Sequence, residues 1–241
     1  RVATEHLPRV QDAYSLRCIP QILRPVFDTL AAYRHVIETE LNSVTDNPIV
    51  DWQSGAFLHG GNFHGDYVAT AVDQLKMTVV KLTILAERQV NFFLTSSLNK
   101  TFPPFLNLKT PGLTLGLQGL QFVATSTAAQ SQTLAFPHSV HSIPTNADNQ
   151  DVVSMGTDAA IIAGKVIANA YVVLTVEMAA LAQAVDFLGE KEKFSGSSQM
   201  LFNFVRRIMP KIVEDRSLVG ELATIVEKIQ KTHEFDMPWE F

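Results

Sequence analysis

Apolar residues recur at three- and four-residue steps over most of the chain, which is the spacing of helices that bury one face. This spacing predicts helices over Pro25–Leu41, Asp66–Phe93 and Leu115–Leu134. On the second of these, the face expected to be buried consists of Val68, Val72, Leu75, Val79, Leu82, Leu85 and Ala86. The segment from about Gln150 to Leu188 is apolar on nearly every face, so we expect other helices to surround it.

Segments rich in proline, glycine and polar residues separate the predicted helices. The segment 47–65 combines alternating apolar residues with several glycines, which indicates a short hairpin or a looped excursion. Residues 135–149 are expected to form a second loop. Two shorter amphipathic helices are predicted over Gln199–Met209 and Ser217–Lys231.

The predicted fold class is all-α, a long antiparallel helical bundle. We expect a single helical domain over residues 1–241, with residues 189–241 forming peripheral C-terminal helices. A central helix of nearly forty residues would extend about 55 Å at 1.5 Å per residue. One small bundle cannot cover such a length, so we expect a homo-oligomer assembled through the long helices.

Composition narrows the possible partners and surroundings. Of the 241 residues 46% are hydrophobic, and the 19 lysines and arginines are scattered in a chain of net charge −5, which argues against binding nucleic acid. A single cysteine, Cys18, excludes an intramolecular disulfide and fits a reducing compartment, so a cytoplasmic location is expected.

Residues 159–188 are apolar, but Lys165 and Glu177 leave no uncharged run of the ~20 residues that a membrane span needs. A buried core helix is the preferred interpretation, and no membrane partner is expected.

One polar cluster stands close to the start of the chain, in the stretch QDAYSLRC. Gln11, Tyr14 and Arg17 follow one another at three-residue steps, which would align them on a tight helical turn. A guanidinium suits a carboxylate, a phenol can donate, accept or move a proton, and an amide adapts to either role. The spacing alone leaves open whether this is a ligand site or only a helix start held by an arginine salt bridge.

A second polar cluster lies in TNADNQDVVSMG, where a loop is expected to become the long apolar helix. Asn149 and Gln150 would stand at the helix N-terminus, where free N–H groups and partial positive charge favour an anionic or polar ligand. An N-cap would explain Asn149 but not Gln150. The histidines His138 and His141 have a His-x-x-His spacing, but without a cysteine or a paired carboxylate they are expected to be structural or solvent-exposed, and no metal site is predicted.

The motifs QDAYSLRCIPQ, TDNPIV, GGNFHGD and NQDVVSMG, in this order and separated by helices, resemble those of the aromatic amino-acid ammonia-lyases. This family, which includes histidine, phenylalanine and tyrosine ammonia-lyases, uses the protein-derived electrophile methylidene-imidazolone (MIO). The resemblance covers most of the chain and implies the aspartase/fumarase-like helical fold and a homotetramer. The Ala-Ser-Gly segment that forms MIO does not occur in these 241 residues. The chain therefore resembles the C-terminal half of such an enzyme, and we expect it to be inactive alone.

The resemblance also implies roles for six residues. Arg17 would bind the substrate carboxylate, Tyr14 would act near the MIO and the amino group as the catalytic residue of this chain, and Gln11 would orient this layer. On the aromatic side, Phe63 would border the MIO and the substrate ring, and Gln150 would meet the substrate together with Asn149.

The implied reaction is the elimination of ammonia from an aromatic L-amino acid to give a trans-arylacrylate. Histidine ammonia-lyases tend to carry glutamate where this chain has Gln150, so the sequence favours tyrosine, then phenylalanine, over histidine. Two other hypotheses stay open, namely a related MIO aminomutase and a non-catalytic helical oligomerisation module. Arg24 departs from the family, which usually has glycine there, and is expected to crowd a helix start or touch a neighbouring subunit.

Overall fold

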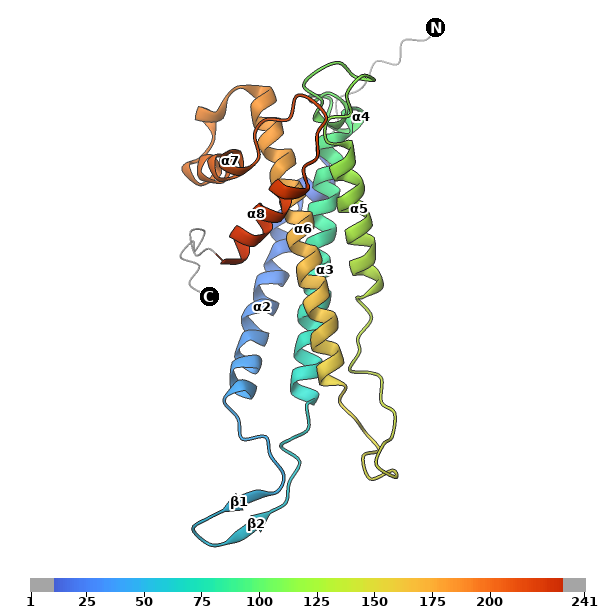
Figure 1. The fold of residues 1–241 in the computed structure, drawn as a ribbon, viewed down its shortest axis with the longest axis vertical. Coiled ribbons are helices and arrows are strands. Elements are labelled where there is room, and N and C mark those ends of the chain that lie inside the picture. Colours follow the sequence, from blue (N-terminus) through green and yellow to red (C-terminus); the bar gives the residue numbers. More distant parts are fainter. Residues whose placement is uncertain (1–10, 232–241) are drawn as a thin grey trace.

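Four long helices form a bundle in the computed structural model, which describes residues 11–231 (Figure 1). At the centre α3 and α6 lie side by side, with α2 packed against α3 and α5 packed against both. Consecutive long helices run in opposite directions, so the two central helices are parallel to each other. The all-α prediction is confirmed for α2 (Ile19–Leu41), α3 (Asp66–Leu94), α5 (Gln118–Thr133) and α6 (Gly156–Leu188).

Short elements occupy both ends of the bundle. The hairpin predicted within residues 47–65 is confirmed, because β1 (Ile49–Asp51) pairs antiparallel with β2 (Ala56–Leu58). The two amphipathic helices predicted near the C-terminus are also present and pack on the C-terminal half of the central helix α6. The remaining elements are α1 (Tyr14–Arg17), α4 (Ser96–Asn99), η1 (Pro104–Leu106), η2 (Lys191–Lys193), α7 (Gly196–Ile208) and α8 (Val219–Lys231).

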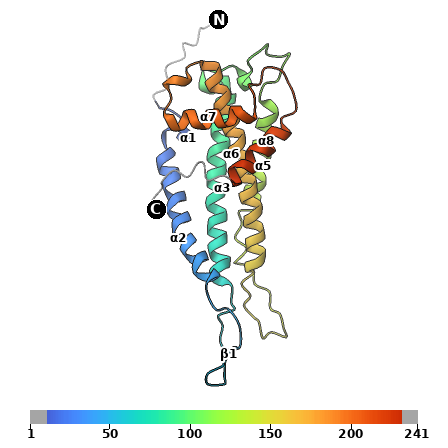
Figure 2. The ribbon, with the colours of Figure 1, turned by 60° about the vertical axis from the view of Figure 1, so that its left-hand side comes forward.

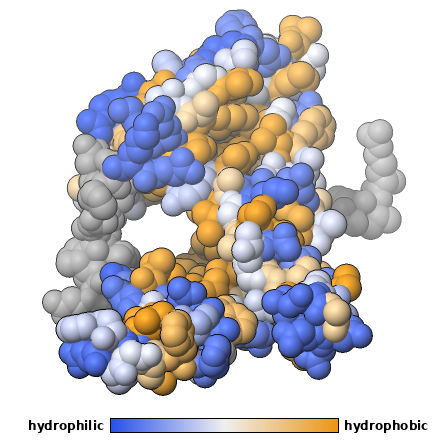
Figure 3. Space-filling model, turned by 60° about the horizontal axis from the view of Figure 1, so that its bottom comes forward, coloured by the Kyte–Doolittle hydropathy of each residue, from blue (hydrophilic) through white to orange (hydrophobic). Residues whose placement is uncertain are grey.

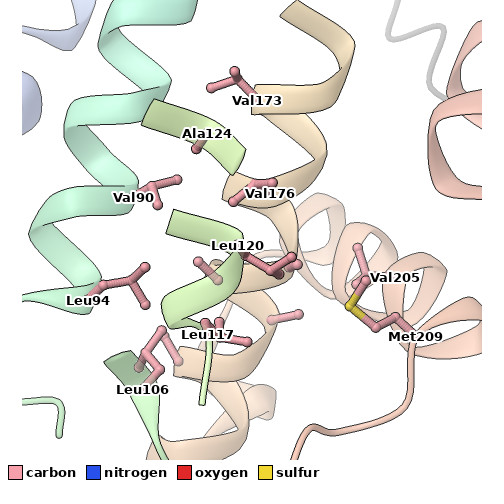
Figure 4. Close-up of a cluster of buried hydrophobic side chains, with 14 of the residues drawn as sticks. Val90, Leu94, Leu106, Leu117, Leu120, Ala124, Val173, Val176, Val205 and Met209 are labelled. Carbon is pink, nitrogen blue, oxygen red and sulfur yellow. The ribbon is translucent and has the colours of Figure 1, made fainter. Parts of the chain in front are cut away.

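The hydrophobic core lies in the half of the bundle where α7 and α8 meet the long helices (Figure 4). Leu94 from α3, Leu120 from α5 and Val176 from α6 point toward one another there, with Val205 and Met209 closing the side next to α7. Each side chain of this size contributes roughly 1.5–3 kcal/mol when it leaves water. We therefore expect this half of the bundle to contribute most of the stability of the fold.

The buried face of α3 is not the one that the apolar spacing predicts. Most residues of the predicted stripe, such as Val68 and Val72, are only half-buried. Eight of the buried residues follow a seven-residue period on the adjacent face and include polar groups: Ala69, Asp73, Lys76, Val80, Thr83, Glu87, Val90 and Leu94. Ala71, Leu85 and Ala86 are buried as well. The prediction is right for Leu85 and Ala86 and wrong for the other residues of the stripe, because charged residues of the adjacent face are buried and paired instead.

The long apolar helix begins at Gly156 rather than at about Gln150. It is 33 residues long, and other helices surround only part of it, because Ile161 is 54% exposed and Ile167 is 41% exposed. By length and composition this helix could cross a membrane, but the core helix of a soluble protein meets the same criteria. Viewed from the hairpin end, Figure 3 shows apolar side chains exposed between the polar lobes of the molecule.

Candidate functional site

Tyr14 and Arg17 lie together on the short helix α1. The guanidinium carbon of Arg17 is 4.7 Å from the centre of the Tyr14 ring, and its Nε donates a 2.9 Å hydrogen bond to the carbonyl of Asp12. Gln11 lies in a bend that precedes the helix, so the alignment of three side chains on one helical turn is wrong for Gln11. The salt bridge considered as the alternative is also absent among the described residues.

The polar groups of this cluster face solvent. The Tyr14 side chain is 68% exposed, and neither Nη group of Arg17 has a partner within residues 11–231. A guanidinium with both terminal nitrogens free presents the planar fork that binds a carboxylate through two parallel hydrogen bonds. The α1 segment is attached to the bundle by Gln89 of α3, whose side-chain amide donates a 2.7 Å hydrogen bond to the carbonyl of Ser15.

Gln150 lies in the loop between α5 and α6, six residues before the helix begins. Its backbone pairs with Thr145 through N–H···O contacts of 3.0 and 3.3 Å, and its Oε1 accepts a 2.9 Å hydrogen bond from the Thr145 hydroxyl. Asn149 belongs to the tight turn that this pairing closes and donates its N–H to Asn146. The prediction that Asn149 and Gln150 stand at a helix N-terminus is therefore wrong.

The geometry of the Gln150 amide limits what it can do. Because the carbonyl oxygen is engaged by Thr145, the amide NH2 is the group left without a partner in the described part of the chain. Gln150 is exposed, so this NH2 is available to donate to an acceptor outside the chain. Thr145 is the first residue of the TNADNQDVVSMG stretch, but sequence reasoning assigned no role to its hydroxyl.

Phe63 lies at the same end of the bundle as the Gln150 loop. Its ring is 52% exposed in the turn that follows β2. The next residue, His64, places its Nε2 3.0 Å from the carbonyl oxygen of Val152, which belongs to the loop carrying Gln150. Gly65 also approaches this loop closely, because a Cβ at that position would lie 3.0 Å from the Ser154 hydroxyl oxygen.

The predicted site residues therefore fall into two groups at opposite ends of the molecule. Gln89, which holds α1, and Asp66, which follows the Phe63 turn, are 23 positions apart on α3. At 1.5 Å per residue they are separated by about 35 Å. Figure 2 shows the same arrangement, with α1 at one end and the hairpin at the other. No single chain can bring Arg17 and Gln150 to one amino acid.

Two buried charged residues near the Gln150 loop were missed by sequence reasoning. Asp73 and Lys76 of α3 are 1% and 0% exposed, and their charged groups are 2.6 Å apart. Burial acts to raise the pKa of Asp73, but the adjacent ammonium of Lys76 and the hydrogen bond from Ser139 outweigh it, so this pKa lies below its usual range. In the sequence the two residues look like an ordinary exposed pair one helical turn apart.

His138, His141 and Arg24 each contact other side chains of this chain. The His138 and His141 rings are in contact, with centroids 5.0 Å apart and their planes tilted by 58°, and no group of three metal-ligating side chains occurs within the described ranges. Arg24 pairs with Asp28 at 2.8 Å on the exposed surface of α2, so it crowds no packed helix start within this chain. Its predicted contact with a neighbouring subunit stays a prediction.

Comparison with known proteins places the chain in a family. Residues 2–207 match the model of the aromatic amino acid lyases. The chain belongs to this family. The match confirms the resemblance carried by the four motifs and spans both groups of predicted site residues.

Several relatives of known name are similar to most of this lyase chain. A tyrosine ammonia-lyase of Cupriavidus metallidurans is 39% identical over 222 residues, which are 92% of this chain and 42% of that protein. A histidine ammonia-lyase of Geobacillus thermodenitrificans is 43% identical, over 90% of this chain and 42% of the relative. An MIO-dependent tyrosine 2,3-aminomutase of Streptomyces globisporus is 40% identical, over 92% and 41%. The chain thus spans about two fifths of the length of these relatives.

Solved structures of the family share the fold. The tyrosine aminomutase from Streptomyces globisporus superposes with a TM-score of 0.87 at 39% identity, covering 95% of this chain and 44% of that one. The histidine ammonia-lyase from Trypanosoma cruzi gives a TM-score of 0.85 at 31% identity, covering 91% and 43%. Both covered shares are below one half of the solved chain, so the complete architecture of the family extends beyond what residues 11–231 describe.

Proposed function

We propose that the chain is the substrate-binding C-terminal portion of an ammonia-lyase that acts on L-tyrosine or L-phenylalanine. The observation that carries the proposal is the exposed guanidinium of Arg17, whose Nη groups have no partner in the described residues and whose plane lies beside the Tyr14 ring. An unpaired fork next to a phenol suits the carboxylate and amino ends of an amino acid. Family membership over residues 2–207 supports the same assignment.

Each predicted residue then has a chemical task. Arg17 holds the substrate carboxylate, and Tyr14 holds or moves a proton at the amino nitrogen, because a phenol both donates and accepts. Gln11 orients this layer from the segment before α1. At the other end of the bundle, Phe63 offers an exposed aromatic face to the substrate ring. Gln150, with Asn149 beside it, donates a hydrogen bond from its amide NH2 to the substrate.

The MIO group implied by the family fits these side chains. All of them are exposed, and the set offers a phenol, an amide and an aromatic ring to a group outside the chain. When bound, this group supplies the electrophile that ordinary side chains lack. Tyr14 and Phe63 would border it, but the chain does not contain the Ala-Ser-Gly sequence that forms it. We therefore expect no turnover from this chain alone.

The substrate preference rests on Gln150. An amide has no charge to offer an imidazole, and its free NH2 suits a neutral or anionic acceptor such as a phenol oxygen. This favours tyrosine, then phenylalanine, over histidine. The names of the relatives do not decide the question, because tyrosine and histidine ammonia-lyases occur at similar identity.

The assembly is proposed to be a homo-oligomer, most simply a tetramer. The two groups of substrate residues are about 35 Å apart on one chain, far more than the length of an amino acid. Arg17 of one copy must therefore meet Gln150 of another copy for both to touch one substrate. The exposed apolar residues of α6, such as Ile161 and Ile167, provide a surface for that association.

A chimaeric enzyme tests the function. The chain is joined behind the N-terminal part of the Cupriavidus metallidurans tyrosine ammonia-lyase, and arylacrylate formation from tyrosine, phenylalanine and histidine is followed by absorbance. We expect product from the chimaera, none from the chain alone, and none from a chimaera carrying Arg17→Ala. A folded, correctly assembled chimaera that converts none of the three amino acids would refute the proposal.

A second candidate function is an aminomutase, which returns the ammonia to the neighbouring carbon. It is favoured by the tyrosine 2,3-aminomutase of Chondromyces crocatus, which is 43% identical over 88% of this chain and 40% of the relative. Chromatography of the products distinguishes the two reactions, because an aminomutase releases a β-amino acid where a lyase releases only the arylacrylate and ammonia.

A further inference from the structure

The loop that carries Gln150 is attached to α3 through a buried pair of charges. Lys76 is completely buried, which is rare for a lysine, and its Nζ lies 2.6 Å from Asp73 Oδ1. That oxygen receives no hydrogen bond of good geometry from any described group, so the contact is an interaction between charges. The remaining bonds of both side chains are directed outside their own helix.

Those remaining bonds end on the first residues of the loop. The ammonium of Lys76 donates a 2.8 Å hydrogen bond to the carbonyl of Phe136, and the second oxygen of Asp73 accepts a 2.7 Å hydrogen bond from the N–H of Ser139. A carbonyl and an N–H three residues apart are thus held by opposite charges on one helical turn. Hydrogen bonds to charged groups are stronger and more directional than neutral ones.

The other end of the loop is held to the start of the same helix. His64 contacts the carbonyl of Val152, and Gly156 stands so close to Gly65 that a Cβ there would be 3.3 Å from the carbonyl oxygen of Gly65. Between the two attachments, the pairing of Thr145 with Gln150 closes the turn. Gln150 therefore has a defined position only while both ends of the loop remain attached.

We propose that Asp73 and Lys76 are positioning residues that hold the 136–139 segment and thereby place Gln150 for the substrate. The proposal rests on the proposed function, which assigns Gln150 to substrate binding. Neither residue can touch the substrate itself, because both are buried beneath the loop. Well-packed apolar residues at positions 73 and 76 would pack α3 against its neighbours equally well. Only the opposite charges of Asp73 and Lys76 can also bind a carbonyl and an N–H of the loop.

Hydrogen exchange measured by mass spectrometry on the 241-residue chain tests the attachment without requiring activity. The variant is the double substitution Asp73→Leu with Lys76→Met, which removes both charges together and leaves neither buried alone. We expect the hydrogen-bonded amides of the loop, those of Ser139, His141, Thr145 and Gln150, to exchange at least about tenfold faster, as the loss of one to two hydrogen bonds implies, while those of α3 and α6 change little.

Thr83→Val is the matched control. Thr83 is also a buried polar residue of α3, but its hydroxyl bonds to the carbonyl of Val79 in its own helix. This variant should leave exchange in the loop unchanged. The proposal is overturned if the double variant leaves loop exchange unchanged, or if the loop and the helices accelerate by the same factor, which would indicate a general loss of stability.

A double-mutant cycle in the active chimaera tests the link to Gln150. If the buried pair acts through Gln150, Gln150→Ala lowers kcat/KM strongly in the otherwise unaltered chimaera and much less in the chimaera that also carries Asp73→Leu and Lys76→Met. Independent, additive losses would overturn the positioning role. A chimaera that makes no product refutes the proposed function instead, and the exchange measurement then decides the attachment alone.

Discussion

Glu177 in the middle of α6 is expected to make the stability of the fold depend on pH. Its side chain is largely buried and has no hydrogen-bond or ion-pair partner in the described part of the chain. Burial raises the pKa of this carboxyl from 4.5 to about 7. The folded chain therefore retains a proton on Glu177 over a range of pH in which the unfolded chain has released it.

The size of the effect follows from this difference. Between pH 4.5 and about 7 the folded state binds more protons than the unfolded state, so the free energy of unfolding falls as the pH rises. At about 1.4 kcal/mol for each unit of pKa, the loss reaches about 3 kcal/mol above pH 7. The stabilisation is fully present below pH 4.5 and is lost as the pH passes the folded-state pKa.

Urea unfolding of the original chain and of Glu177→Gln, at pH 5 and pH 8 and at one protein concentration, measures this effect. Glutamine cannot ionise, so between pH 5 and pH 8 the free energy of unfolding of the variant should rise by about 2.5 kcal/mol relative to that of the original chain, the rest of the effect being lost already at pH 5. Glu227→Gln is the control, because Glu227 is exposed and its pKa is lowered by Lys231. Parallel pH profiles for Glu177→Gln and the original chain would refute the reasoning.

Three further substitutions test the core, a turn and the proposed carboxylate site. Leu94→Ala, at a position only 2% exposed, should lower the free energy of unfolding by about 2–5 kcal/mol in urea titrations. Gly116→Ala should cost about 1–3 kcal/mol in the same assay, because φ is +57° and the new Cβ would lie 2.7 Å from the carbonyl of Phe105. Arg17→Lys in the chimaera should raise KM about tenfold or more, since an ammonium cannot form the two parallel bonds of a guanidinium.

Helical periodicity predicted the elements of this fold well. The helix expected over Asp66–Phe93 is observed as Asp66–Leu94, and the two short C-terminal helices and the hairpin lie where they were expected. The start of α6 was placed too early because Val152, Val153 and Met155 continue the apolar pattern of the helix. In the structure Val153 donates to Ser142, and Met155 has a φ of +55°, so these residues belong to the loop.

The sequence motifs predicted which residues belong to the site but not how these residues are arranged in space. The three-residue spacing correctly predicted that Tyr14 and Arg17 lie side by side. The sequence did not reveal that Phe63 and Gln150 lie at the far end of α3. The roles of these residues stay predictions. The buried pair on α3 escaped notice because a Lys and an Asp three positions apart usually face water, and the sequence does not show that the bundle and the 136–139 segment cover this face.

The separation of the two groups of predicted site residues has a genetic consequence if they bind one substrate as proposed. In the proposed assembly, each active site takes Arg17 from one copy of the chain and Gln150 from another copy. A substitution of Arg17 and a substitution of Gln150 therefore affect different copies at each active site. Copies carrying one defect and copies carrying the other, mixed during assembly, would therefore form some sites with both residues intact. Two inactive alleles of the same gene would complement each other, whereas two alleles altered at the same end of the bundle would not.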